Sequence, residues 1–374
     1  MKSVGGKMVF TQDQVIFSSS QLINTYLDVY PPKTKEYLES LKKKYTSGQI
    51  IEKLTQIIPF NVLVIGDAII DQYHYCLPLG KSSKEPVMVH RYTGEESFTG
   101  GSLMTANHIA SICNRISLVT VLGKKRSMRP FIIKHLKKAV TPAFFYEKKM
   151  STITKRRYVD AFTRQKLFQI SYLLDVEIDK SLEKDIIKYL KTEIKKYDLV
   201  VVNDFGHGMM TEKIIKLVCR RAAFLALNVQ ANSANYGFNI ITKYKRADFI
   251  CIDEQEIRLA THEKYDDLKP LVRKVGRILK CPNIIVTKGP EGSINFSEGT
   301  GFSYTPSLTH NIVDRVGAGD ALFAYTSICQ FSKIDWELVS FIGNVAGALH
   351  IQTVGNKKPV ELVDMVKFIT RLLK

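Results

Sequence analysis

The residues best suited to chemistry gather in one short loop near the end of the chain. Within NIVDRVGAGDALFAYTS (311–327), a G-A-G run (317–319) separates two carboxylates, Asp314 and Asp320. Glycines let a backbone approach a ligand closely, and the N–H groups at the start of a helix attract anions. A carboxylate beside such a site is useful if it takes a proton from a hydroxyl that attacks a phosphoryl group held there. The structural alternative is a tight turn, with Asp320 merely placed at the positive end of a helix dipole.

This loop needs a rigid frame, and the hydrophobic pattern of residues 61–374 predicts one. Apolar, β-rich runs alternate with segments of helical periodicity, which favours a parallel sheet covered by helices on both faces. In such a sheet, ligands bind beyond the carboxyl ends of the strands. We expect strands at 61–66, 116–122, 198–203, 224–229, 248–252 and 284–288, and helices at 101–114, 127–139, 180–196, 211–223, 266–280, 318–331 and 335–352.

Two stretches interrupt the alternation of strands and helices. Segments 82–94 and 151–175 alternate polar and apolar residues, which predicts antiparallel strands that are exposed on one face. We therefore expect one α/β domain over 61–374, with a small β-sheet lid built from these two segments. Residues 1–60 form an N-terminal extension of a different character, with a serine cluster, charged amphipathic helices and no visible chemistry.

The composition is that of an ordinary globular chain, with 45% hydrophobic and 24% charged residues. We expect no membrane span and no signal peptide, because no apolar run has the required length and setting. The six cysteines lack metal-ligand spacing, so we expect reduced thiols in a cytoplasmic protein. The net charge of +18 comes mostly from dispersed lysines, which argues against nucleic-acid binding and suits small anionic substrates.

The loop DRVGAGD (314–320) resembles the C-terminal signature of the ribokinase-type (PfkB) carbohydrate kinases. The resemblance covers about residues 61–374 and implies a ribokinase-like fold, a three-layer αβα sandwich around a mainly parallel sheet with a β-sheet lid. Four further segments match that family in the same order: GDAIIDQY (66–73) its first strand and substrate aspartate, FTGGSLMTANHIA (98–110) its di-glycine segment, DEQE (253–256) the end of its N-x-x-E motif, and TKGPEG (287–292) its T-x-G-x-x-G loop.

The resemblance implies roles for individual residues. Asp320 would be the catalytic base, and the backbone N–H groups of Gly317, Ala318 and Gly319 would hold the charge on the transferred phosphoryl group. Asp314 would shape the loop or a nearby cation site, which adds potassium as an expected activator beside ATP and Mg²⁺. The other expected contacts are Asp71, Gly100, Gly101, Lys155 and Arg157 with the sugar, Thr287, Gly289, Gly292 and Asp314 with the nucleotide, and Glu256 with Mg²⁺ through water.

Within the family, the chain most resembles kinases of D-glycero-D-manno-heptose 7-phosphate. SSKEPVMV (82–89), TITKRRYV (152–159) and NDFGHG (203–208) are similar to their flap strand, their T-x-T-K-x-R stretch and their S-D-Y-x-K-G segment. This implies ATP-dependent phosphorylation of a heptose 7-phosphate at C1, for a precursor of surface polysaccharide. The alternatives are a kinase for another sugar or keto-deoxy sugar acid, and an idle paralogue that binds nucleotide or sugar without turnover.

Several residues depart from the family pattern or have two interpretations. Met104 and Thr105 stand where relatives carry a sugar-binding Asn, and Asp253 replaces the Asn of N-x-x-E. These departures put the identity of the sugar in doubt, while the residues of the transfer chemistry are intact. Lys155 and Arg157 either bind a substrate phosphate or lie on the solvent-exposed face of a strand. His207, where relatives often carry Lys, either contacts an anion or caps a turn between glycines.

The resemblance extends to partners. GGKMVFTQDQVIFSSSQLIN (5–24) resembles the tail of the nucleotidyltransferase domain that is fused to such kinases, although the H-x-G-H motif of that domain is absent. We interpret residues 1–60 as a remnant or linker of that domain and expect a separate nucleotidyltransferase as a candidate partner. A homodimer through the lid is expected as well, because exposed strand edges need covering.

Overall fold

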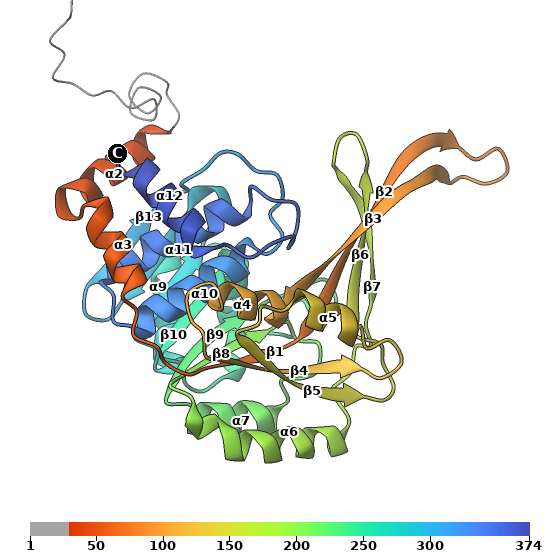
Figure 1. Ribbon diagram of the computed structural model, residues 1–374, viewed down its shortest axis with the longest axis horizontal. Helices are drawn as coiled ribbons and strands as arrows, with labels where there is room; N and C mark the ends of the chain where they lie inside the picture. Colours follow the sequence, from red (N-terminus) through yellow and green to blue (C-terminus); the bar gives the residue numbers. More distant parts are fainter. Residues whose placement is uncertain (1–29) are drawn as a thin grey trace, which may run out of the picture.

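A nine-stranded sheet runs through the protein, with helices on both of its faces (Figure 1). The computed structural model describes residues 30–374. The strand order is β13-β12-β11-β10-β9-β8-β1-β4-β5. β12 pairs antiparallel with both β11 and β13, and every other neighbouring pair in this order is parallel. The strands are β1 (Val62–Gly66), β4 (Ile116–Gly123), β5 (Val140–Glu147), β8 (Leu199–Asp204), β9 (Phe224–Val229), β10 (Phe249–Asp253), β11 (Asn283–Thr287), β12 (Ser293–Ser297) and β13 (Gly301–Thr305).

The sheet divides the hydrophobic core into two halves. Along β1, Val62 and Val64 belong to one cluster of buried residues, and Leu63 and Ile65 belong to the other, because successive side chains of a strand point to opposite faces. The first cluster is covered by α4 (Ser102–Ile109), α5 (Arg129–His135), α10 (Ala318–Phe331), α11 (Trp336–His350) and α12 (Leu362–Leu372), and the second by α6 (Lys180–Glu193), α7 (Glu212–Arg221), α8 (Glu254–Thr261) and α9 (Leu268–Leu279).

The predicted αβα fold class is confirmed by these layers. Each strand and helix expected from the hydrophobic pattern is present within a few residues of its predicted bounds. The pattern missed β5, β12, β13, α8 and α12. No helix between residues 30 and 374 is long and apolar enough to cross a membrane.

A second, four-stranded sheet, the lid, stands beside the main body at the upper right of Figure 1. Its strand order is β3-β2-β6-β7. β6 and β7 fall within 151–175, and β3 begins inside 82–94, whereas β2 follows β1 almost directly and was not expected as a lid strand. The lid strands are β2 (Ala68–Lys81), β3 (Met88–Gly101), β6 (Ile153–Asp160) and β7 (Lys166–Tyr172).

Residues 30–60 pack onto the main body of the protein. Leu41 of α2 (Pro32–Lys44) and Ile50 of α3 (Ser47–Thr55) are fully buried in the same cluster as α11 and α12. The division at residue 60 stays a prediction, and the segment compared with a nucleotidyltransferase tail (5–24) lies outside the described residues.

Candidate active site

A cavity of about 570 Å³ opens at the carboxyl ends of β9, β10 and β11, between the lid and the first turn of α10. Two of the expected site residues, Gly100 and Asp314, are not among the residues that line it in the described chain. The other expected residues all line this one cavity: Asp71, Gly101, Lys155, Arg157, Glu256, Thr287, Gly289, Gly292, Gly317, Ala318, Gly319 and Asp320.

Asp320 lies in the first turn of α10 and is almost fully buried. Its Oδ1 accepts hydrogen bonds from Asn203 Nδ2 at 2.9 Å and Gln230 Nε2 at 3.0 Å. Burial raises the pKa of Asp320 to about 7, and the negative charge of Asp71 acts in the same direction against the two hydrogen bonds and Lys155. A carboxylate with a pKa near neutrality is a stronger base than an ordinary aspartate, so the site favours proton abstraction at this residue.

The G-A-G loop depends on glycine at its first position. Gly317 has φ of +86°, and a Cβ there would lie 2.0 Å from Asn356 Oδ1 and 2.6 Å from His350 Nε2. A Cβ at Gly319 would have no atom within 4 Å among the described residues. Because the first N–H groups of a helix have no intrahelical acceptor, the start of α10 can receive an anion beside Asp320.

Asp71 is held from two sides near the base of the lid. Its Oδ1 accepts a hydrogen bond from Arg157 at 2.5 Å, and its Oδ2 accepts one from Asn356 Nδ2 at 2.9 Å. Gly100 lies against the carboxylate, since a Cβ there would come within 2.2 Å of Asp71 Oδ2. Arg157 therefore already has an ion-pair partner within the protein, and in this respect it differs from Lys155.

Lys155 lines the cavity with its charge unpaired. Its Nζ has no hydrogen-bond acceptor and no ion pair among residues 30–374, and it lies 5.5 Å from the centre of the Phe205 ring. Burial lowers the pKa of Lys155, and the nearby carboxylate of Asp71 acts against that effect. A half-buried cation without an ion-pair partner in the described chain is unfavourable, so this ammonium is suited to an anionic group on a ligand.

His207 is buried beside Lys155 in the FGHG loop. Neither ring nitrogen has a hydrogen-bond partner within the described range, so the interpretation that the ring caps a turn is wrong. Burial and the positive charge of Lys155 lower the pKa of His207 to about 4. Gly206 and Gly208, on either side, have φ of +68° and +93°. The ring is therefore a neutral, unpaired imidazole in a fixed backbone.

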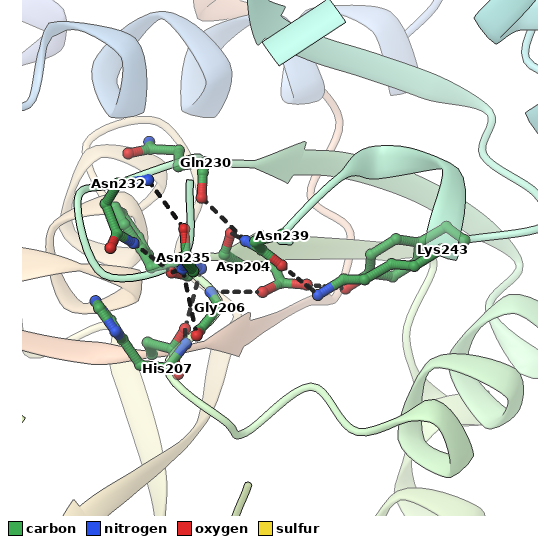
Figure 2. A network of polar contacts seen from close by, with 11 residues as sticks. Asp204, Gly206, His207, Gln230, Asn232, Asn235, Asn239 and Lys243 are labelled. Carbon is green, nitrogen blue, oxygen red and sulfur yellow. Dashed lines mark hydrogen bonds and ion pairs between the residues drawn. The ribbon is translucent and has the colours of Figure 1, made fainter. Parts of the chain in front are cut away.

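A polar network holds that backbone in place (Figure 2). Asn232 and Asn235 both donate to the carbonyl oxygen of Phe205 at 2.7 Å, and Asn239 donates to the carbonyl of Asp204 at 3.2 Å. The carboxylate of Asp204 is paired with Lys243 at 2.6 Å. The loop that carries His207 is thus fixed by side chains from the segment after β9.

Glu256 combines a structural contact with a position in the cavity. In a capping box at the start of α8, its Oε2 accepts from the N–H of Asp253 at 2.8 Å, while its Oε1 accepts from the N–H of Ala231 at 3.0 Å. Burial, and then the charge of Asp253, raise the pKa of Glu256 to about 8. Each oxygen keeps a free lone pair, which fits a water-mediated contact with Mg²⁺.

A direct metal centre is a different matter. In the part of the chain that the structure describes, no three His, Cys, Asp or Glu side chains come together in a way that could hold a metal ion.

Asp314 connects the loop to the lid. Its Oδ1 accepts from Lys166 Nζ and its Oδ2 accepts from the hydroxyl of Tyr73 at 2.7 Å. Burial alone would raise the pKa of Asp314, but the hydrogen bonds from Lys166 and Tyr73 outweigh it and hold the pKa below its ordinary value.

Sequence reasoning missed the residues that support these groups. Asn203, near the end of β8, also donates to Thr105 Oγ1 at 2.7 Å, so the departure at Thr105 belongs to the same hydrogen-bond chain as Asp320. Gln230 and Asn356 had no local signature, since single polar residues at strand ends and in loops are common. Only the quoted NDFGHG motif pointed toward this region.

The comparison with protein families decides the class of the protein. The model described as "pfkB family carbohydrate kinase" matches residues 60–361. The chain belongs to the pfkB family of carbohydrate kinases. It is therefore a sugar kinase, and the resemblance stated from the sequence motifs is confirmed.

Curated relatives of this kinase include proteins named "Bifunctional protein HldE". The one from Geobacter metallireducens is 23% identical over 313 residues, and the one from Campylobacter jejuni is 25% identical over 312 residues; each alignment covers 82% of this chain. The chain spans only 63% and 64% of the length of these two relatives.

Solved structures share the fold of the kinase. The ribokinase from Thermotoga maritima superposes with a TM-score of 0.64 at 15% identity, covering 83% of this chain and 99% of that one. Phosphofructokinase-2 from Escherichia coli, in complex with potassium, gives a TM-score of 0.66 at 13% identity, covering 85% and 100%. At these identities the likeness confirms the ribokinase-like fold.

Proposed function

We propose that this kinase transfers the γ-phosphoryl group of ATP to the C1 hydroxyl of a heptose 7-phosphate in the cytoplasm, for a precursor of surface polysaccharide. The observation that carries the transfer chemistry is the buried carboxylate of Asp320 at the N-terminus of α10, in the same cavity as the expected sugar and nucleotide residues.

The chain's own residues divide the work of the reaction. The sugar lies between Asp71, the di-glycine segment and the lid, and Asp320 accepts the proton of the attacking hydroxyl. Base help of this kind contributes about 10²–10⁴ in rate, so most of the acceleration comes from placement and from the N–H groups at the start of α10. Mg²⁺, bound with ATP and reached by Glu256 through water, supplies neutralisation of phosphate charge.

A phosphorylated substrate is supported by Lys155. Arg157 forms an ion pair with Asp71, whereas the ammonium of Lys155 lines the cavity without an ion-pair partner among residues 30–374. An existing phosphate on the sugar gives that buried charge a counter-ion. A keto-deoxy sugar acid offers a carboxylate to the same group, so it is the second candidate. The likeness of segments 82–89, 152–159 and 203–208 to heptose 7-phosphate kinases favours the heptose phosphate.

We extend the proposal to two partners. The relatives are called bifunctional, so a nucleotidyltransferase partner is proposed to act with the kinase. A second copy is proposed to cover the outer face of the lid. There the stacked rings of Tyr158 and Phe168 (4.5 Å between centres) join His74 and Tyr92 in an aromatic row across the sheet. Phe168 is 53% exposed and β7 is an edge strand of the lid, which suits pairing with another chain.

The substrate is tested by incubating the kinase with MgATP and a panel of sugars, with the products identified by ³¹P NMR. The panel compares heptose 7-phosphate with unphosphorylated heptose, hexose phosphates and keto-deoxy acids. Preferred turnover of another sugar keeps the kinase and discards the heptose pathway.

The phosphate contact is tested by Lys155→Met. This variant should raise KM for the heptose phosphate by about 10- to 100-fold, which corresponds to the loss of one charged hydrogen bond, and leave KM for the unphosphorylated sugar nearly unchanged. An equal increase in KM for the phosphorylated and the unphosphorylated sugar would show that Lys155 does not contact the substrate phosphate.

A further inference from the structure

The loop before the G-A-G run is where the family resemblance places a monovalent cation, and a potassium complex exists among the structural relatives. Potassium is held by oxygen ligands, carboxylate and carbonyl, that have lone pairs directed at the ion. The relevant oxygens of this chain are those of the Asp314 carboxylate and of the neighbouring backbone carbonyls. Their contacts decide whether the ion fits.

The carboxylate of Asp314 is already saturated by protein donors. Its Oδ1 receives the ammonium of Lys166 at 2.5 Å and the N–H of Val316 at 3.1 Å. Its Oδ2 receives the hydroxyl of Tyr73 at 2.7 Å and the N–H of Gly355 at 3.0 Å. With each oxygen accepting two hydrogen bonds, the lone pairs that a potassium ion needs are occupied.

Two carbonyl oxygens near Asp314 also accept hydrogen bonds within the described chain. His350 Nε2 lies 3.1 Å from the carbonyl oxygen of Val316, so the ring donates there. The carbonyl of Ile351 accepts from the N–H groups of both Val313 and Asp314, at 2.8 and 3.1 Å. The residues present do not fit a potassium ion in this loop.

The charge that replaces the ion is on the lid. Lys166 is the first residue of β7, the edge strand of the lid, and its side chain reaches from there to Asp314, which is buried in the main body. Tyr73, also from the lid, contacts the same carboxylate. The loop that precedes the start of α10 thus receives its positive charge from the lid.

We propose that the Lys166 ammonium is the built-in monovalent cation of the Asp314 loop, so that this kinase does not need potassium. The proposal concerns the same site as the proposed function, but it is tested by binding as well as by turnover. One consequence is that lid closure and the ordering of the loop become a single event, because the cation moves with the lid.

The test compares the full chain in KCl and in tetramethylammonium chloride at equal ionic strength. Wild type should have the same kcat/KM in both salts, within about twofold. Lys166→Met should lose about 10- to 100-fold in tetramethylammonium and recover most of it in KCl or ammonium chloride, because removal of the side chain frees Asp314 and opens room for an ion. Two control variants should have the same kcat/KM in both salts. They are Lys166→Arg, which keeps the charge, and Lys84→Met, at an exposed lysine of the β2–β3 hairpin.

Thermal unfolding gives a readout that does not depend on any substrate. A ligand that binds only the folded state raises its stability as RT ln(1 + [L]/Kd), so Tm of Lys166→Met should rise with KCl while Tm of wild type should not. Potassium activation or stabilisation of wild type would overturn the proposal, and so would a Lys166→Met variant that folds but ignores potassium in both measurements. If no sugar is turned over by wild type, the proposed function fails while the Tm comparison still decides the cation.

Discussion

Asn203 donates a hydrogen bond from its side-chain amide to Asp320, at 2.9 Å, across 117 residues of sequence. Asn203 is the penultimate residue of β8, which lies beside β1 in the main sheet, and Asp320 lies in the first turn of α10. This contact and its counterpart from Gln230 keep the Asp320 carboxylate ionisable in an environment that otherwise disfavours its charge.

The rate should therefore depend on pH through Asp320. Because its pKa is raised to about 7, kcat/KM should rise as pH increases from 6 to 8 and then level. Gln230→Ala removes a hydrogen bond that favours the ionised form, so the acid limb should move to higher pH. Steady-state pH profiles of both proteins test this. An acid limb near pH 4 in wild type, or one that Gln230→Ala does not move, would contradict the assignment.

Gly317 and Gly319 offer a matched pair of substitutions. Gly317→Ala places a Cβ against Asn356 at a positive φ, so it should destabilise the fold by more than about 1 kcal/mol and reduce kcat by about 10²–10³-fold. Gly319→Ala meets nothing in the described protein, so stability should be kept or slightly raised. Its activity should fall all the same, because the methyl group occupies the approach of the phosphoryl group. Urea unfolding and steady-state kinetics separate the two effects, and a fully active Gly319→Ala would count against the anion site.

Asp320→Asn should make the folded protein more stable while it removes turnover. A carboxyl whose pKa is raised on folding costs stability at every pH above its ordinary value of 3.8, and the cost grows until pH reaches about 7. Asn keeps the acceptor oxygen for Asn203 and Gln230. The gain in free energy of unfolding should be on the order of 1–3 kcal/mol at pH 8 and smaller at pH 5.

Asp160→Asn is the control for that experiment. The pKa of Asp160 is lowered, first by a hydrogen bond from the N–H of Thr163, so the charged form is favoured in the folded state. Its replacement should not stabilise the protein at pH 8. Chemical denaturation of the three proteins at both pH values is the measurement, and an Asp320→Asn gain that is equal at pH 5 and pH 8 would contradict a raised pKa.

The sequence carried the reacting residues but not their supports. Asp320 and the G-A-G run stand together in seven residues, and glycines before a helix have a local physical meaning that a single sequence reveals. Asn203, Gln230 and Asn356 act only because the fold brings distant strand ends and loops together. The raised pKa of Asp320 was equally invisible, because it comes from burial.

The lid strands were also only partly predictable from the sequence. β2 was not expected as a lid strand, because GDAIIDQY (66–73) resembles the first strand of the family and follows β1 almost directly; its break from β1 comes from tertiary pairing with β3 and β6. The role of Arg157 was also decided by that pairing. The register of β2 and β6 pairs Asp71 with Lys155 and Tyr73 with Arg157. The side chain of Arg157 nevertheless binds Asp71, and Lys155 has no ion-pair partner among the described residues.

We expect Asp320 to be the base with which this protein transfers a phosphoryl group from ATP to a sugar. The most direct measurement is ADP release from MgATP, with and without heptose 7-phosphate, in wild type and in Asp320→Asn. We expect sugar-dependent ADP release in wild type and a loss of at least about 10²-fold in Asp320→Asn, with ATP binding retained. Equal ADP release by the two proteins, or no ADP release with any sugar from folded wild type that binds ATP, would contradict it.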